Sequence, residues 1–383
     1  MNSKFSKSVS FIKSKFPTSD FIALHEPRFN GNEKKYLNEA IDSTFVSSIG
    51  EFVNKFEDMM CEITGAKYAV AVVNGTSALH LGLLVSGVKC EDEVLTQSLT
   101  FIATANAISY IGADSVFIDV DRDTMGMSPS ALENYLNEFA EKKNGETFSK
   151  VSGKRIKACV PMHTYGFPCR TKELAQICKS WGITLVEDTA ESIGSYQNGV
   201  HTGLDGLVGA FSFNGNKTVT CGGGGALITN DEDVAKLAKH LSTQAKIPHR
   251  WEFRHDHIGY NYRMPNLNAA LACAQLEQLP EYIISKRKLA AEYAEFFNEL
   301  GIQFVTEVKG TEASYWLNCL LFEDKDERDG FLTYANKNGV MSRPAWELMH
   351  TLDMFKNSHK GPMKNSEWIV DRLVNIPSSV RIQ

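Results

Sequence analysis

The sequence lacks an apolar run long enough to cross a membrane and lacks any excess of basic residues. Its longest uninterrupted apolar runs, 68–73 and 269–274, contain six residues each, whereas a membrane-spanning helix needs about 20. Forty Lys and Arg against 46 Asp and Glu give a net charge of −6. The chain as a whole therefore has no electrostatic reason to bind nucleic acid or an anionic membrane. We expect neither as a partner, and a small molecule instead.

Paired and clustered cysteines are also lacking. The eight cysteines, at positions 61, 90, 159, 169, 178, 221, 273 and 319, form no C-x-x-C pair and no Cys/His cluster, which argues against a zinc site and a disulfide framework. The basic N-terminus has neither the apolar core nor the cleavage site of a secretory signal. We expect a cytoplasmic location and no metal. Phe5, Val9, Ile12 and Phe16 recur at helical spacing, which predicts an N-terminal amphipathic helix within residues 1–25.

From about residue 30 to 240, helical patterns alternate with short apolar, β-branched segments. The seven strand candidates are Ala69–Val73, Glu93–Thr96, Ser115–Ile118, Ile156–Val160, Thr184–Val186, Ala210–Phe213 and Gly225–Thr229. Such alternation predicts an α/β fold with a mostly parallel seven-stranded sheet covered on both faces. Ligands of these sheets bind in the loops at the carboxyl ends of the strands. We therefore expect the site in those loops.

The pattern changes past residue 265. A long helical stretch interrupted by Pro280 runs to about Leu300, and a strand, a helix and a second strand are expected at Tyr315–Phe322, Glu327–Asn338 and Val340–Arg343. At about 150 residues per domain, the length of the chain allows two domains. We predict a large domain over 26–264 and a small C-terminal α/β domain over 265–383, with the cleft between them as the default pocket.

The first chemical signal is the segment Asn74–Leu79, which follows a predicted strand and begins a helical pattern. Gly75 allows a tight turn, while Thr76 and Ser77 offer N–H groups and hydroxyls at a helix N-terminus, where an anion is stabilised. An ordinary N-cap would use the same residue types. The segment is neither a P-loop nor the spaced-glycine dinucleotide fingerprint.

Two further signals follow later strands. Glu187 and Asp188 come directly after Thr184–Val186, with small Thr189 and Ala190 beside them, and Lys217 lies between a Ser/Asn/Gly turn and the four glycines 222–225. Pyridoxal phosphate needs an anion cradle, a carboxylate for its ring nitrogen and a lysine for the Schiff base. The three signals together favour this cofactor. Each of the three signals also has a structural explanation, such as a helix cap or a solvated lysine. The residues alone therefore leave open both a cofactor site and ordinary structural roles.

At this point the sequence resembles the DegT/DnrJ/EryC1/StrS sugar aminotransferases, which have the aspartate aminotransferase type I fold. The motifs that carry the resemblance are Asn74–Leu79, Thr100–Thr104, His163–Gly166, Glu187–Asp188, Phe211–Phe213 with Lys217, and Gly259–Met264, all in the family's order. The resemblance extends over nearly the whole chain, from Gly31-Asn32-Glu33 to Asn375–Ser379. It implies a transaminase with a large cofactor domain and a small C-terminal domain.

The resemblance also implies roles for individual residues. Lys217 would be the Schiff-base lysine and proton carrier, Asp188 would pair with the pyridinium nitrogen, and Phe101 and Ala190 would flank the ring. The phosphate would be held by Gly75, Thr76, Ser77 and Ser212, and by Asn261 of the neighbouring subunit, which implies a homodimer with shared active sites. Many relatives have His where this chain has Glu191, so the contact of Glu191 with the cofactor is the least defined of the set.

Within the family, His25–Arg28, Ser212–Lys217 and Arg343–Trp346 look most like the LegC-type enzymes. Those enzymes transfer the amino group of L-glutamate, through the pyridoxamine phosphate form, to C4 of a UDP-linked 2-acetamido-4-keto-6-deoxy sugar. A near relative, perosamine synthase, acts on GDP-4-keto-6-deoxymannose, and motifs hardly separate the two. Candidate substrate residues are Arg28, Ser48, His163, Arg343 and Trp346. Arginine suits a pyrophosphate, whereas a packed histidine is the structural alternative for His163.

Two rival functions stay open at this stage. A non-catalytic regulatory protein that binds the cofactor or a sugar on the same fold is one, since fold does not settle function, although the intact Lys217 and Asp188 speak against it. A cysteine desulfurase or other cofactor lyase is the second. It would need a mobile nucleophilic cysteine, and Cys221 inside the glycine run is poorly placed for that.

Overall fold

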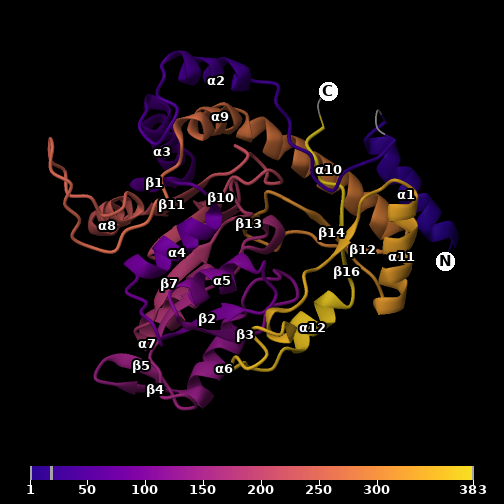
Figure 1. The fold of residues 1–383 in the computed structure, drawn as a ribbon. Coiled ribbons are helices and arrows are strands. Elements are labelled where there is room, and N and C mark those ends of the chain that lie inside the picture. The colour runs from indigo at the N-terminus through magenta and orange to yellow at the C-terminus, as the bar shows by residue number, and fades with distance from the viewer. Residues whose placement is uncertain (1, 18–19, 382–383) are drawn as a thin grey trace.

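The computed structural model describes residues 2–17 and 20–381 and divides into a large α/β body and a smaller C-terminal part (Figure 1). None of the described helices is both long and apolar enough to cross a bilayer.

A seven-stranded sheet forms the centre of the large body. In sheet order its strands are β1 (Tyr68–Val72), β11 (Gly225–Thr229), β10 (Val208–Ser212), β7 (Thr184–Asp188), β6 (Ile156–Val160), β2 (Glu93–Gln97) and β3 (Asp114–Ile118). β11 is antiparallel to both its neighbours, and all other pairs are parallel. The predicted mostly parallel seven-stranded sheet is confirmed. The expected strand Thr184–Val186 extends to Asp188, so that this carboxylate belongs to the strand itself.

Helices cover both faces of this sheet because successive strand residues point to opposite sides. Val70 and Val72 of β1 pack in one cluster with the helices α4 (Gly75–Val85), α5 (Ala103–Tyr110) and α8 (Glu232–Ser242). Ala71, between them, packs in another cluster on the opposite face. The helices of that face are α3 (Glu51–Thr64), α6 (Pro129–Phe139), α7 (Thr171–Trp181) and α9 (Asn266–Glu277).

Shorter elements decorate the large body. They are α2 (Glu33–Asp42), the 3-10 turn η1 (Thr164–Gly166), the hairpin β4 (Ala140–Lys143) and β5 (Glu146–Ser149), and the ribbon β8 (Tyr196–Gln197), β9 (Val200–His201) and β13 (Thr311–Glu312). Residues 243–262, which we call the arm, lie between α8 and α9 and project from the left side in Figure 1. The arm exposes Trp251, Phe253 and Ile258, the last by 85%.

The C-terminal part is built on an antiparallel four-stranded sheet. Its strands, in order, are β12 (Gln303–Phe304), β14 (Asn318–Leu321), β16 (Leu373–Ile376) and β15 (Arg343–Pro344), and its helices are α10 (Leu279–Glu299), α11 (Lys325–Lys337), α12 (Lys364–Val370) and the 3-10 turn η2 (Met349–Thr351). The strand expected at Val340–Arg343 is wrong in position. β15 starts at Arg343, and Val340 forms only an isolated bridge to Ile22.

The N-terminal helix α1 (Asn2–Lys15) packs on this C-terminal part. The Phe11 ring stacks on Phe296 at 3.8 Å between centroids, and the Phe5 ring meets Phe331 edge-on at 5.6 Å. Helix α1 covers residues 2–15 of the segment over which the sequence predicts a helix. Of the predicted segment 1–25, residues 1, 18 and 19 lie outside the described residues.

Helix α9 packs with the large body although the predicted boundary at residue 265 assigns it to the small domain. Its side chains Ala269, Ala272 and Cys273 share a cluster with Phe56 of α3 and Phe211 of β10. The division of the chain at 265 stays a prediction, and this packing favours a later boundary.

Candidate active site

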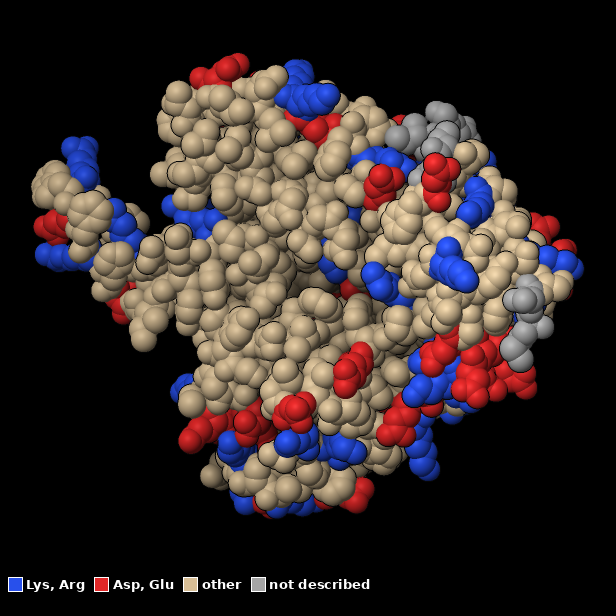
Figure 2. Space-filling view, turned by 45° about the vertical axis from the view of Figure 1, so that its right-hand side comes forward, with Lys and Arg blue, Asp and Glu red and all other residues tan. Residues whose placement is uncertain are grey.

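A cavity of about 350 Å³, which we call the Lys217 pocket, opens at the carboxyl edge of the large sheet. It is lined by Asn74, Gly75, Thr76, Leu79, Phe101, Ala103, Met162, Asp188, Ala190, Glu191, Ser212, Asn214, Asn216, Lys217, Trp316 and Trp346. The loops after β1, β2, β6, β7 and β10 supply most of these residues, because parallel strands end at the same edge of a sheet. Only the two tryptophans come from the C-terminal part. Figure 2 shows a hollow near the middle of the molecule, with basic side chains beside it.

The start of α4 forms one end of the Lys217 pocket. The Asn74 side chain caps the helix by accepting the Ser77 N–H at 2.8 Å. The N–H groups of Gly75 and Thr76 are the next donors at this helix N-terminus, where an anion is stabilised. A Cβ on Gly75 would lie 2.7 Å from Ser212 Cβ, so only glycine lets the helix start approach Ser212 this closely. Ser77 itself is buried and does not line the pocket.

Asp188 lies at the bottom of the pocket and is 2% exposed. Its carboxylate accepts hydrogen bonds from the Thr104 hydroxyl at 2.7 Å and from the Ala190 N–H at 3.1 Å. Burial raises the pKa of Asp188, and these two hydrogen bonds and the charge of Lys217 offset part of that rise. Both direct donors are neutral, so Asp188 is a buried carboxyl group that a cationic ligand atom would stabilise.

Lys217 and Glu191 form an ion pair across the pocket. Lys217 Nζ lies 3.2 Å from Glu191 Oε1 and 4.1 Å from the centroid of the Trp316 ring. Glu191 Oε2 accepts the Tyr165 N–H at 2.8 Å. Burial raises the pKa of Glu191 to about 7, against the opposing charge of Lys217. The lysine is therefore held in position by an acid that titrates near neutral pH.

Phe101 and Ala190 lie on the walls of the same pocket. Phe101 is 49% exposed, although it is aromatic, and its ring lies 6.1 Å from that of Trp346. An exposed aromatic face beside a buried carboxylate suits a flat ligand ring with a protonated nitrogen. The residue types needed for pyridoxal phosphate thus line one cavity: donors for an anion at the start of α4, Asp188 for a ring nitrogen, Lys217 for a Schiff base. The residues fit the cofactor.

His163 does not line the pocket, and its candidate role in binding substrate is wrong for this structure. The ring is completely buried; it accepts the Cys169 N–H at Nδ1, 3.1 Å away, and contacts Glu187 Oε2 from Nε2 at 3.0 Å. Because Nδ1 accepts a hydrogen bond, Nε2 carries the proton and donates it to Glu187. Burial acts to raise the pKa of Glu187, but His163 and the N–H groups of Gly203 and Gly206 lower it. The pair is structural, behind the sheet edge.

Of the remaining candidate substrate residues, two line a cavity and two do not. Trp346 lines the Lys217 pocket, and Arg343 lines the neighbouring cavity. Arg28 lines neither, since its guanidinium pairs with Glu26 at 2.8 Å and donates to the Val380 carbonyl. Ser48 also lies outside both, in the loop where Ser47 accepts the Asn266 N–H.

Asn261 lies at the base of the arm, exposed and opposite Thr243, and it does not reach the pocket of its own chain. That position leaves its predicted contact across a subunit interface as a prediction.

Sequence reasoning missed two residues that matter to the pocket. Thr104 lies in the Thr100–Thr104 motif, which gave it no role of its own, yet its hydroxyl orients Asp188 from behind the pocket wall. Trp316 lies under the lysine, and its indole donates to the Asn216 carbonyl at 2.7 Å. Trp316 lies within the predicted strand Tyr315–Phe322 of the small domain. Nothing in the sequence indicates that it reaches the pocket, because its contact joins residues 100 positions apart.

Cys221 does not support a lyase. Its thiol is buried and contacts the Gly223 carbonyl at 3.4 Å, and burial raises the pKa of Cys221 to about 12. The thiol is therefore protonated at neutral pH and cannot act as a nucleophile.

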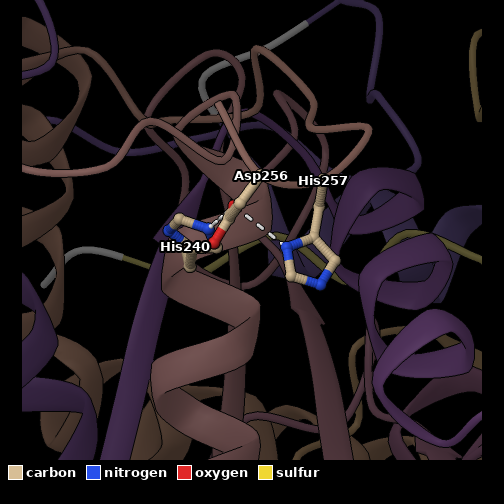
Figure 3. Close-up of side chains that lie close together, drawn as sticks. All are labelled: His240, Asp256 and His257. Atoms are coloured by element: carbon tan, nitrogen blue, oxygen red, sulfur yellow. Dashed lines mark hydrogen bonds and ion pairs between the residues drawn. The ribbon is translucent and has the colours of Figure 1, made fainter. Parts of the chain in front are cut away.

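A second group of titratable side chains lies at the base of the arm (Figure 3). Asp256 Oδ1 accepts from His240 Nε2 at 2.6 Å and from His257 Nδ1 at 2.9 Å. Within the described part of the chain, this is the group of three side chains whose spacing could admit a metal ion. The two hydrogen bonds already satisfy the facing atoms and attach the arm to the end of α8, which gives the group a structural explanation.

Comparison with known proteins gives a consistent result. The DegT/DnrJ/EryC1/StrS aminotransferase family model matches residues 27–383. GDP-perosamine synthase of Escherichia coli O157:H7 is 37% identical, covering 94% of this chain and 93% of its own, and that of Vibrio cholerae is 36% identical, covering 93% and 94%. The crystal structure of the aminotransferase TlmJ from Streptoalloteichus hindustanus superposes with a TM-score of 0.84 at 26% identity, over 93% of each chain.

Proposed function

The chain belongs to the DegT/DnrJ/EryC1/StrS aminotransferase family, a pyridoxal-phosphate-dependent sugar aminotransferase, and we propose that it transfers the amino group of L-glutamate to C4 of GDP-4-keto-6-deoxymannose. Two observations together support the choice. Lys217, Asp188 and the start of α4 converge on one cavity, and the chain is 37% identical to a GDP-perosamine synthase along nearly its full length. The regulatory protein considered from the sequence is set aside, because the chain is an enzyme of this family.

The polar groups that converge on the Lys217 pocket each have a proposed task in this reaction. Bound pyridoxal phosphate supplies an electron sink for the carbon that bears the transferred amine. The N–H groups of Gly75 and Thr76 and the Ser212 hydroxyl would hold the phosphate, and Asp188 would accept a hydrogen bond from the protonated ring nitrogen. Lys217 Nζ would hold the cofactor and would carry the proton that the transfer moves.

Glu191 holds the ammonium of Lys217 in reach while the lysine is not bonded to the cofactor. The pair is 3.2 Å apart in the structure. A carboxyl group with a pKa of about 7 accepts or releases a proton at little cost near neutral pH. Glu191 therefore assists in moving the proton at Nζ.

A UDP-linked 2-acetamido-4-keto-6-deoxy sugar is the second candidate substrate. The LegC-type motifs His25–Arg28 and Arg343–Trp346 favour it, whereas the two curated relatives are named for a GDP-linked product. We place the GDP sugar first because the similarity to these two relatives extends over nearly the whole chain, whereas the LegC-type motifs cover only short segments. In either case the product belongs to the amino sugars of bacterial surface glycans.

The test is a substrate panel. The purified enzyme, loaded with cofactor, is incubated with L-glutamate and with each of the two 4-keto sugars, and the product is identified by mass and by the C4 configuration in its NMR spectrum. We expect the GDP-linked amino sugar to form with the higher kcat/KM. Faster amination of the UDP sugar would reverse the order of the two candidates.

We also propose a homodimer in which the arm meets the second subunit. Support comes from the exposed apolar residues Trp251, Phe253 and Ile258 and from Asn261, which is exposed and does not line the pocket of its own chain. Large exposed apolar side chains grouped on one segment are typical of an interface. Sedimentation of the cofactor-loaded protein tests this: a monomer that still retains the cofactor would contradict the proposal.

A further inference from the structure

A second cavity of about 350 Å³, which we call the His25 cavity, adjoins the Lys217 pocket. The two share Asn216, Trp316 and Trp346 as wall residues. The other lining residues of the His25 cavity are Leu24, His25, Tyr165, Leu317, Met341, Arg343, Pro344 and Asn375. A group bound in this cavity would therefore be separated from Lys217 by the width of a side chain.

His25 reaches this cavity with both ring nitrogens unsatisfied. Nδ1 and Nε2 are buried and have no hydrogen-bond partner in the described structure. A buried polar group left without a partner lowers stability, and such groups are rare in folded proteins. The imidazole thus offers a hydrogen-bond donor and an acceptor, and neither has a partner among the described residues.

The charged side chain among the described residues that line the cavity is basic. Arg343 lines the cavity, is exposed, and its guanidinium has no hydrogen bond or ion pair to any described residue. Burial and the charges of Lys286, Lys217 and Arg28 lower the pKa of His25 well below its ordinary value. Among the described residues that line the cavity, none is Asp or Glu. A ligand that carries negative charge would compensate this excess.

We propose that the His25 cavity is an anion subsite of the active centre, in which Arg343 and His25 bind an oxyanion of a substrate. This inference rests on the proposed function, which supplies two such oxyanions. One is the carboxylate of the amino donor, and the other is a phosphate of the nucleotide sugar. Arg343 would pair with two oxygens of either group, and neutral His25 would donate one hydrogen bond.

The two half-reactions of a transaminase distinguish the sources. Loss of the absorption of the lysine-bound cofactor on adding L-glutamate measures the first, and its return on adding the keto sugar to the aminated enzyme measures the second. The variants are Arg343→Ala, His25→Leu and His25→Gln, where glutamine keeps a donor near the position of Nε2. Lys356→Ala, which removes an exposed positive charge from the same part of the chain, is the matched control.

We expect Arg343→Ala and His25→Leu to raise KM for one substrate at least tenfold, and to leave the other half-reaction within about twofold. His25→Gln should recover part of the loss. A changed glutamate half-reaction identifies a carboxylate subsite, and a changed sugar half-reaction identifies a phosphate subsite. Calorimetric titration with glutarate and with GDP gives a readout independent of turnover, in which the same variants should weaken one probe.

Unchanged KM values and unchanged binding of both probes would overturn the subsite. Equal loss in both half-reactions together with a lower melting temperature would also overturn it, since a structural role of His25 would have that effect. Failure of the wild-type enzyme to aminate the GDP sugar would instead contradict the proposed function, and the glutamate half-reaction would still test the subsite.

Discussion

The Lys217 pocket and the His25 cavity share a wall, but they differ in whether their key polar groups already have hydrogen-bond partners. In the Lys217 pocket, Asp188 accepts two hydrogen bonds and Glu191 pairs with both Lys217 and a backbone N–H. In the His25 cavity, neither imidazole nitrogen has a hydrogen-bond partner among the described residues. Groups that are satisfied beforehand are fixed in position and need no reorganisation during reaction. Unsatisfied groups gain their partner only when a ligand arrives, so the first site suits a resident cofactor and the second a transient substrate.

The largest effect expected in this comparison follows from Lys217→Ala. The variant should bind the cofactor without the absorption of the lysine-bound form, and kcat should fall by at least about 10²–10⁴-fold, the contribution of one positioned proton-transfer group. Ultraviolet–visible spectra and steady-state kinetics measure both. Lys236→Ala, on the exposed side of α8, is the control. Turnover within tenfold of wild type would assign the chemistry to another group.

Asp188→Asn should have the next largest effect. Removal of one preorganised charge typically costs roughly 10²–10³-fold in rate, and asparagine can still accept the Thr104 hydrogen bond. Thr104→Val removes that hydrogen bond and keeps the charge, so it should cost about tenfold or less. Single-turnover rates with L-glutamate compare the two. Equal losses would mean that the position of the carboxylate, and not its charge, is what matters.

Gly75→Ala tests the anion end of the Lys217 pocket. The added Cβ would lie 2.7 Å from Ser212 Cβ, so the start of α4 or Ser212 must move, and cofactor affinity should fall about tenfold. Equilibrium dialysis against cofactor measures the change. Gly215→Ala is the matched control, because a Cβ there meets nothing within 4 Å. Equal affinity in both variants would show that the close approach at Gly75 is not needed.

The smallest effect concerns pH. Burial raises the pKa of Glu191 to about 7, above the value of about 4.3 in an unfolded chain. Its contribution to stability is therefore fully present below about pH 4.3 and is lost as the pH rises through 7. Relative to wild type, the free energy of unfolding of the Glu191→Gln variant should rise by up to about 3 kcal/mol between pH 5 and pH 8. Denaturant unfolding at both pH values checks this, and a constant difference would contradict the raised pKa.

Much of the Lys217 pocket was predictable because its residues follow strands. Asp188, Ser212 and the start of α4 each come at a strand end, and parallel strands bring their ends together. The role of His163 was not predictable. A histidine after a strand can face the ligand or turn back into the protein, and its partners Glu187 and Cys169 are a matter of packing.

The sequence predicted Arg343 and Trp346 as candidate substrate residues, but it could not show that they share one cavity with His25. His25 comes from the N-terminal segment, Trp316 and Arg343 from the C-terminal part, and Asn216 from the large body. No local pattern links such distant residues. The boundary at residue 265 stays a prediction for a similar reason, since α9 is recognisable as a helix in the sequence but its packing partners in α3 and β10 are set by tertiary structure.

Helix α1 also has a consequence for the order in which the chain folds during synthesis. Its aromatic partners Phe296 and Phe331 lie in α10 and α11. At 5–20 residues per second, a ribosome makes these partners roughly 15–60 s after α1 emerges. During that interval Phe5, Val9 and Ile12 have no core to enter. Helix α1 can therefore dock only after α10 and α11 have been made, and its lysine side chains keep it hydrated until then.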